Sequence, residues 1–203
     1  MAHASVGFEV NSPAQLAALA SSSRQEIIDV LAQMGTVSVC ELGNALGRPP
    51  DAIYYHLRVL KSCGLVLTAG YRTIGRRKEE LIRCVSPNVQ LQYELGPNGN
   101  ASRIRDIVSS MLRLGIRDFA AALGETDTCT SGPGREIWAM RKTGWLNPDE
   151  LVKLNEAIQD IGTAASKPHG KGRLFGVTVI LTPLNHRARS GYRKTGSKRG
   201  KSV

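Results

Sequence analysis

Residues 38–86 read SVCELGNALGRPPDAIYYHLRVLKSCGLVLTAGYRTIGRRKEELIRCVS. Ser38 and Glu41 have the spacing of a capping box, in which each side chain accepts a backbone hydrogen bond at a helix start. Gly47 is predicted to end this helix, because glycine adopts the left-handed conformation at little cost. The two prolines that begin at Pro49 cannot lie in a helix interior, so the chain must turn there. The stretch therefore predicts a first helix followed by a tight turn.

A second helix, with Asp51 as its predicted N-cap, has one apolar and one polar face. Ile53, Leu57 and Leu60 recur at the spacing of a buried stripe. The opposite face offers side chains that would contact base edges if the helix entered the major groove of DNA. These candidates are Ala52, Tyr54, Tyr55, Arg58 and Lys61.

Two β-prone runs follow, at residues 65–67 and 81–85, with a basic hairpin tip between them. Such a tip, in which Gly75 precedes three consecutive basic residues, is suited to phosphates or to a minor groove. The candidate phosphate contacts are Arg48, Arg72, Arg76, Arg77 and Lys78. Helix, turn, helix and hairpin in this order predict a winged helix-turn-helix, a DNA-reading module. A solvated hairpin on an ordinary globular domain is the alternative.

Over roughly Gln15–Pro87 the chain resembles the ArsR-like branch of bacterial winged-helix transcriptional regulators. Leu19–Arg24 and Glu26–Leu31 are similar to the opening helices of that family. Ile53–Leu57 and Leu60–Val66 are similar to its recognition helix and the exit from it. The resemblance implies a dimeric repressor or activator that binds a pseudo-palindromic operator.

The net charge of +10 is concentrated in two parts of the 203-residue chain. Residues 48–78 hold seven basic residues against the single acid Asp51, and residues 185–203 hold seven basic residues and no acid. Positive charge on the candidate reading head favours double-stranded DNA as the partner. The tail, predicted to be disordered, either contacts DNA or acts as a solubilising end.

Metal binding is not expected. Cys40, Cys63, Cys84 and Cys129 do not form a Cys-x-x-Cys zinc motif. The segment around Cys40 is similar to the arsenic-sensing box of some family members, but a soft ion needs several thiolates. Zinc-sensing relatives carry histidines on the helix that corresponds to residues 101–124, where this chain has none. We therefore expect no metal and no cofactor, and the sequence does not identify a small-molecule effector.

Residues 101–124 are predicted to form an amphipathic helix after a turn-rich linker at 95–100. In the resembled family, helices that flank the winged domain make the dimer. The apolar residues then expected in a homodimer interface are Ile104, Ile107, Met111 and Phe119. Packing against another part of the same chain would cover this stripe equally well.

The remaining segment contains both tryptophans, Trp138 and Trp145, and a helix start at Asn147–Glu150 with proline at the first helical position. Residues 174–181, LFGVTVIL, are the clearest β-strand pattern in the chain. This strand would pair with its twin across a dimer or with the winged domain. The tryptophans either line a ligand pocket or, as the favoured interpretation, anchor the segment to the rest of the chain.

These patterns predict a mainly α protein with a small β-wing (α+β). We expect a winged helix-turn-helix domain at 1–94, a helical dimerisation and effector segment with a helix and a strand at 95–184, and a basic tail at 185–203. No apolar run has the roughly 20 residues of a transmembrane helix. The N-terminus also lacks a secretion signal. A cytoplasmic protein without a membrane partner is therefore expected.

The leading functional hypothesis is a sequence-specific, dimeric DNA-binding transcriptional regulator. A winged-helix module that docks proteins without reading DNA is the alternative, and would lack salt-dependent, sequence-selective DNA binding. The sequence has no P-loop, dinucleotide fingerprint or nucleophile elbow, so enzymatic activity is not expected.

Overall fold

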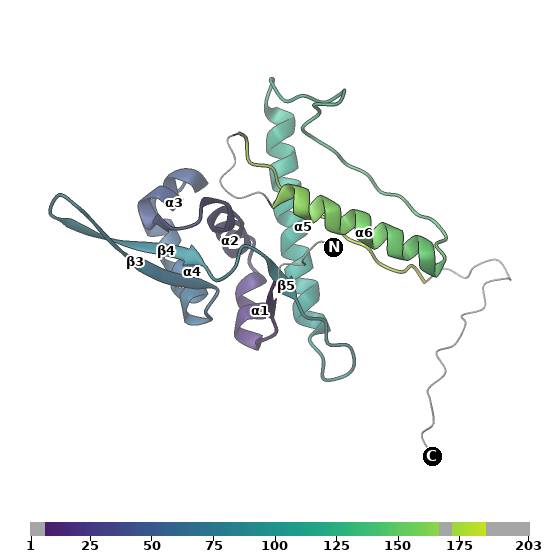
Figure 1. Cartoon of the computed structure of the whole chain (residues 1–203), viewed down its shortest axis with the longest axis horizontal. Coiled ribbons are helices and arrows are strands. Elements are labelled where there is room, and N and C mark those ends of the chain that lie inside the picture. The colour runs from purple at the N-terminus through teal and green to yellow at the C-terminus, as the bar shows by residue number, and fades with distance from the viewer. Residues whose placement is uncertain (1–6, 167–171, 186–203) are drawn as a thin grey trace, which may run out of the picture.

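The structure, a computed structural model, describes residues 7–166 and 172–185. In chain order its elements are β1 (Phe8–Val10), α1 (Pro13–Leu19), α2 (Ser22–Met34), β2 (Val37–Ser38), α3 (Val39–Leu46), α4 (Pro50–Ser62), β3 (Val66–Ile74), β4 (Arg77–Cys84), β5 (Val89–Leu91), α5 (Ala101–Gly124) and α6 (Pro148–Ala165). Helices α1 to α4 form one lobe beside the long helix α5, and the β3–β4 hairpin projects from that lobe (Figure 1).

Three strands form an antiparallel sheet in the order β2-β4-β3. In this sheet β4 pairs with β2 through Val37↔Ile82 and with β3 through Val66↔Cys84. The hairpin therefore starts under the helices and extends beyond them as a wing. This arrangement confirms the predicted winged helix-turn-helix and the α+β fold class.

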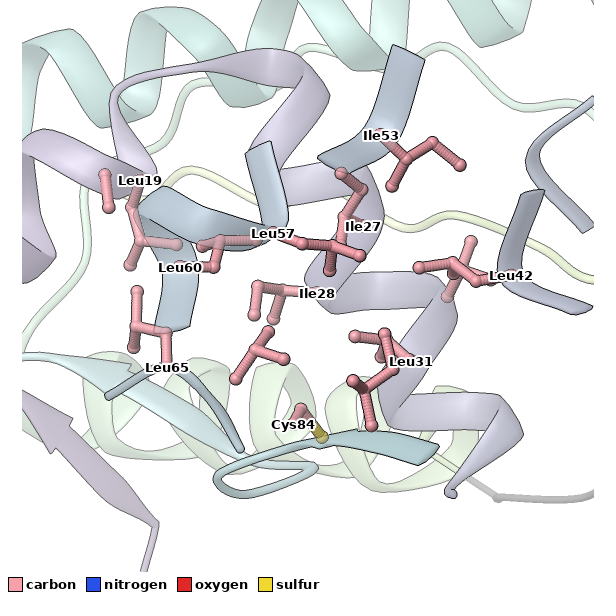
Figure 2. Close-up of a cluster of buried hydrophobic side chains, with 14 of the residues drawn as sticks. Leu19, Ile27, Ile28, Leu31, Leu42, Ile53, Leu57, Leu60, Leu65 and Cys84 are labelled. Carbon is pink, nitrogen blue, oxygen red and sulfur yellow. The ribbon is translucent and has the colours of Figure 1, made fainter. Parts of the chain in front are cut away.

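The hydrophobic core lies between α2, α4 and the base of the wing (Figure 2). Ile27 and Leu31 of α2, Ile53 and Leu60 of α4 and Leu65 before β3 are each 0% exposed. These are the apolar positions that the helical and strand periods bring to one side. The core thus fixes α4 so that its other face points outward.

Helix α5 begins as part of the same core. Ile104 and Ile107 are buried, and Gln25 Nε2 donates to the carbonyl oxygens of Leu19 at 2.6 Å and of Ile107 at 3.1 Å. Ser110 Oγ donates to a carbonyl of the α1–α2 turn. Buried polar groups that find partners across elements hold those elements in one register. The first half of α5 is therefore attached to α1 and α2.

A second, two-stranded sheet was not predicted. β1 pairs in parallel with β5, with Phe8 opposite Val89 and Val10 opposite Leu91. The strands are three residues long, and Val10 is 0% exposed while Val89 and Leu91 are half-buried. Strands of three residues are too short to show the alternation of apolar and polar residues by which a strand is predicted from sequence. They form because the segment before α1 and the start of the linker to α5 meet over the core.

Three expectations about element boundaries need correction. Residues 174–181 form no strand, because a strand needs a partner and no other described segment pairs with them. The N-cap of α4 is Pro49, and Asp51 lies in the first turn. The β3–β4 pairing continues to Ile74↔Arg77, so the strands extend well beyond the predicted runs 65–67 and 81–85, and the basic tip between them is a two-residue turn.

The described helices include none that is both long enough and apolar enough to cross a membrane. The basic tail, apart from residue 185, lies outside the described residues. The predicted division of the chain at residue 94 remains a prediction.

We expect Leu60→Ala to lower the free energy of unfolding by about 2–5 kcal/mol, because it removes a 0% exposed side chain and leaves a cavity. Urea unfolding followed by circular dichroism measures this loss. Tyr55→Ala, at a position 58% exposed, is the control and should change stability by less than about 0.5 kcal/mol. A similar, small effect of both substitutions would contradict the position of α4 in the core.

Candidate nucleic-acid interface

The turn between α3 and α4 depends on two glycines. The predicted capping box of α3 is confirmed, since Ser38 Oγ accepts from the Glu41 N–H and a Glu41 carboxylate oxygen accepts from the Ser38 N–H. Gly47 ends the helix with a φ of 62° in the left-handed region. A Cβ at Gly43 would lie 2.8 Å from the carbonyl oxygen of Arg48, so only glycine lets the turn close against α3. The importance of Gly43 was not recognised from the sequence.

Helix α4 presents the polar face that its sequence predicts. Ala52 and Arg58 are exposed, Tyr54 and Tyr55 are 53% and 58% exposed, and Lys61 is half-buried. The Arg58 guanidinium lies 5.9 Å from the centre of the Tyr55 ring, a cation–π contact that restrains its side chain. The exposed face of α4 therefore carries two aromatic rings and one arginine held beside them.

The wing places three basic side chains at its end. The turn is formed by Gly75, with a φ of 60°, and Arg76, while Arg77 and Lys78 begin β4. All three basic residues are exposed, and Lys78 Nζ lies 4.4 Å from the centre of the Tyr71 ring across the hairpin. The glycine that the sequence indicated at the tip thus makes the turn, and the cations cluster around it.

Two other basic candidates bind carboxylates that hold the wing in place. Arg72 donates to Glu41 at 3.1 Å and to Glu79 at 3.0 Å, which joins β3 to the start of α3. Lys61 Nζ lies 2.5 Å from Glu80 Oε1, which joins α4 to β4. The pKa of Glu41 is lowered first by the Ser38 backbone N–H and then by Arg72. Its carboxylate therefore stays charged well into the acidic range.

Arg48 is also occupied. Its guanidinium lies 2.5 Å from Glu26 Oε2, and the other oxygen of Glu26 lies 2.7 Å from Arg117 on α5. Glu26 thus connects the helix-turn-helix turn to the middle of α5. Within the described part of the chain, by contrast, Arg58, Arg76, Arg77 and Lys78 form no ion pair.

The acids Glu26, Glu41, Glu79 and Glu80 determine which cations remain unpaired, and their ion pairs were not predicted from the sequence. Glu79 and Glu80 directly follow the basic run, and this proximity was the sequence signal that could have indicated ion pairs. Because neighbouring residues of a strand point to opposite faces, each can bind a different cation. The contacts to Glu26 and Glu41 span 22 and 31 residues, so no local pattern reveals them.

The exposed face of α4 and the end of the wing form one surface. A shallow hollow between them is lined by Ser38, Val39, Cys40, Tyr54, Arg77, Lys78, Glu79 and Glu80. Tyr54 also lines a second hollow with Arg58 and Lys61. Tyr54 therefore joins the side chains of α4 to the cations of the wing.

The cysteines and histidines are dispersed. Cys40 and Cys129 are exposed, Cys63 is half-buried and Cys84 is buried. In residues 7–166 and 172–185, no group of three or more His, Cys, Asp or Glu side chains is placed to hold a metal ion. Burial, aided by Arg24 and Arg48, lowers the pKa of His56 and disfavours its charged form, so His56 is a poor phosphate contact near neutral pH.

The four apolar residues expected in a dimer interface lie in different environments. Ile104 and Ile107 are buried in the core of their own chain, and Met111 is half-buried against it. Phe119 is half-buried but is not among the residues that pack against the core. Exposed apolar side chains recur near it on the same helix, at Leu112, Ile116 and Leu123.

The two tryptophans do not anchor their segment to the rest of the described structure. Trp138 is 66% exposed and Trp145 is 72% exposed. Arg135 lies 4.2 Å from the centre of the Trp138 ring, a contact within the segment itself. The anchoring interpretation is therefore wrong for a single chain.

Comparison with known families supports the helix-turn-helix. Residues 21–68 match the model of a family described as bacterial regulatory protein, arsR family. The match runs from the start of α2 through α3 and α4 into β3, and leaves the wing tip, α5 and α6 outside it. No curated protein sequence matches the chain at a significant level.

Proposed function

We infer that this chain, a DNA-binding transcription regulator with an ArsR-like helix-turn-helix domain, acts as a homodimer that reads a pseudo-palindromic operator. The observation that carries the proposal is the single surface on which Tyr54 joins the exposed face of α4 to the basic end of the wing. On such a surface a duplex meets side chains for base edges and cations for phosphates together.

In this proposal α4 enters the major groove. Ala52, Tyr54, Tyr55 and Arg58 would face base edges, with Ala52 placed for a thymine methyl group. Arginine is the side chain best suited to guanine, since its planar fork donates to both O6 and N7. The Tyr55 ring restrains the Arg58 side chain, so less conformational entropy is lost when Arg58 binds a base.

Phosphate binding is assigned first to Arg76, Arg77 and Lys78. These exposed cations can bind phosphate without breaking an ion pair inside the protein. Arg48, Lys61 and Arg72 would have to exchange a carboxylate partner for a phosphate. Their proposed role is to hold the turn and the wing at the angle that DNA requires, with phosphate contact as a secondary role.

The dimer is proposed to form on the outer face of α5. Leu112, Ile116, Phe119 and Leu123 recur at intervals of four, three and four residues, which places them along one side of a helix. Ile107 lies on the opposite side, against the core. Among the residues first expected in the interface, Phe119 remains central, Met111 lies at its edge, and Ile104 and Ile107 contribute by fixing α5 to its own domain.

We expect Arg58→Ala to reduce discrimination between specific and scrambled DNA by about 1–3 kcal/mol, while weak non-specific binding remains. Gel-shift titrations against both duplexes measure this difference. Arg141→Ala removes an exposed arginine outside the proposed interface and is the matched control. Unchanged discrimination in the Arg58 variant would remove Arg58 from base readout.

Selection of bound duplexes from a random pool tests the function as a whole. A recovered palindrome gives specificity, symmetry and half-site spacing together, since two related heads read sites about one helical turn apart. Failure to enrich any sequence, with binding that does not depend on salt, would favour the protein-docking alternative.

A further inference from the structure

The segment from residue 136 to residue 185 is here termed the arm, and its described residues form no hydrophobic core of their own. None of its described residues, 136–166 and 172–185, is buried. Its solvent-exposed large apolar side chains are between 41% and 73% exposed. Monomeric proteins rarely leave a contiguous apolar surface of this extent in water. We therefore expect a surface outside the described residues to cover the arm.

The arm nevertheless contains a well-capped helix, α6. Asn147 caps α6 and forms a capping box with Glu150, and Pro148 occupies the first turn. The apolar residues of α6 recur at helical spacing, at Leu151, Leu154, Ile158 and Ile161. Helix α6 is therefore amphipathic and well capped but has no buried side chain. Since most of the stability of such a helix comes from packing of its apolar face, we infer that this face packs against another surface.

Residues 174–181 have the composition of a strand without its pairing. No backbone hydrogen bond joins them to another described residue. Alternate side chains of a strand point to opposite faces. In LFGVTVIL this puts Phe175, Val177, Val179 and Leu181 on one wholly apolar face. Leu174, Gly176, Thr178 and Ile180 lie on the other.

The position of this segment points to its partner. A Cβ at Gly115 of α5 would lie 3.6 Å from Thr178 Oγ1, so the segment crosses α5 next to Ile116. Arg173 holds its beginning by ion pairs to Glu125, just beyond α5, and to Glu136. A second copy that approached the outer face of α5 would therefore meet this segment.

Surface area and charge agree with a second copy as the occupant. Since an aromatic side chain offers about 150–250 Å², Trp138, Trp145 and Phe175 together expose on the order of 350 Å². That is nearly half of the roughly 800 Å² that each partner contributes to a standard interface. Helix α6 carries a net negative charge and α5 a net positive one, so one chain offers both complementary surfaces.

We propose that residues 174–181 pair antiparallel with the same residues of a second copy of this chain, and that the arm thereby completes the dimer interface over α5. This inference rests on the proposed homodimer and adds the element that closes it. Self-pairing about a two-fold axis would give the backbone groups along the inner edge of each segment hydrogen-bond partners and place the two apolar faces side by side on one face of the pair.

The test is a cysteine scan in the full-length chain. The exposed thiols are first removed by Cys40→Ser and Cys129→Ser. Single cysteines are then introduced as Phe175→Cys, Val177→Cys, Thr178→Cys, Val179→Cys and Leu181→Cys. In an antiparallel pair with two-fold symmetry one residue faces its own copy, with Cβ atoms about 4.5–5.5 Å apart, within reach of a disulfide after slight adjustment.

We expect the rate of oxidative cross-linking into dimers to be highest at one tested position, or at two tested neighbours that flank the symmetry axis. This rate should be at least about tenfold higher than for Lys142→Cys. It should fall at the tested positions on either side. Sedimentation and operator binding are measured on every variant. A dimer that binds operator but cross-links no faster than the Lys142 control at any position would overturn the arm pairing and leave the proposed function intact. A monomer would overturn both.

Discussion

Replacing Arg76, Arg77 and Lys78 together by alanine is expected to weaken binding to specific and non-specific DNA alike, by about 100- to 1000-fold at 0.1 M salt. Each phosphate contact releases condensed counterions, which at this salt concentration is worth about a factor of ten. These three cations carry no acidic partner in the described part of the chain, so the protein does not compensate for their loss. Titrations at several salt concentrations should show a log–log slope reduced by about three.

The matched control for the wing variant is Arg141→Ala, Lys142→Ala and Lys153→Ala. It removes the same charge from exposed positions away from the surface joined by Tyr54. We expect its salt slope to match that of the original protein. A wing variant with the same slope as this control would show that the hairpin tip does not touch DNA.

Ile116→Glu is expected to convert the dimer to a monomer and to lower operator affinity by about 10²- to 10⁴-fold. Ile116 is 69% exposed, so the substitution leaves the core of the chain intact while placing an unpaired charge in the proposed interface. Two linked heads bind two half-sites with a high effective concentration, and a monomer loses that gain. Sedimentation at micromolar concentration and gel-shift titration measure the two effects.

Ala121→Glu adds the same charge to another exposed side of α5 and is the control for this experiment. It should remain dimeric. If the original protein sediments as a monomer, or if the Ile116 variant remains a dimer with full affinity, α5 does not form the interface. Circular dichroism of the Ile116 variant should match that of the original protein, which separates dissociation from unfolding.

The comparison between sequence and structure is clearest along α5. The sequence predicted the helix bounds, because helix periodicity and the flanking turn are local properties. It treated the apolar residues as one stripe, whereas Ile107 packs on α2 and Ile116 faces outward. A 24-residue helix can bury different faces along its length, and only the position of the neighbouring helices decides which.

The charges of the wing and of the helix-turn-helix were likewise predicted only in part. The sequence indicated that residues 48–78 are basic, and this concentration of charge was correct. It did not indicate that Arg72, Lys61 and Arg48 are bound to Glu41, Glu80 and Glu26. An ion pair depends on distances of a few ångströms between residues far apart in the chain, which composition does not specify.

Sequence patterns alone were enough to predict the elements whose causes are local: the helix caps at Ser38 and Asn147, the left-handed turn at Gly47 and the buried stripe of α4. The packing of the folded chain fixes which cations remain free for DNA and which face of α5 is left open, and it leaves residues 174–181 without a strand partner among the described residues. Caps and turns are satisfied within a few residues, whereas ion pairs, buried faces and strands require a partner that the fold, or a second chain, must bring.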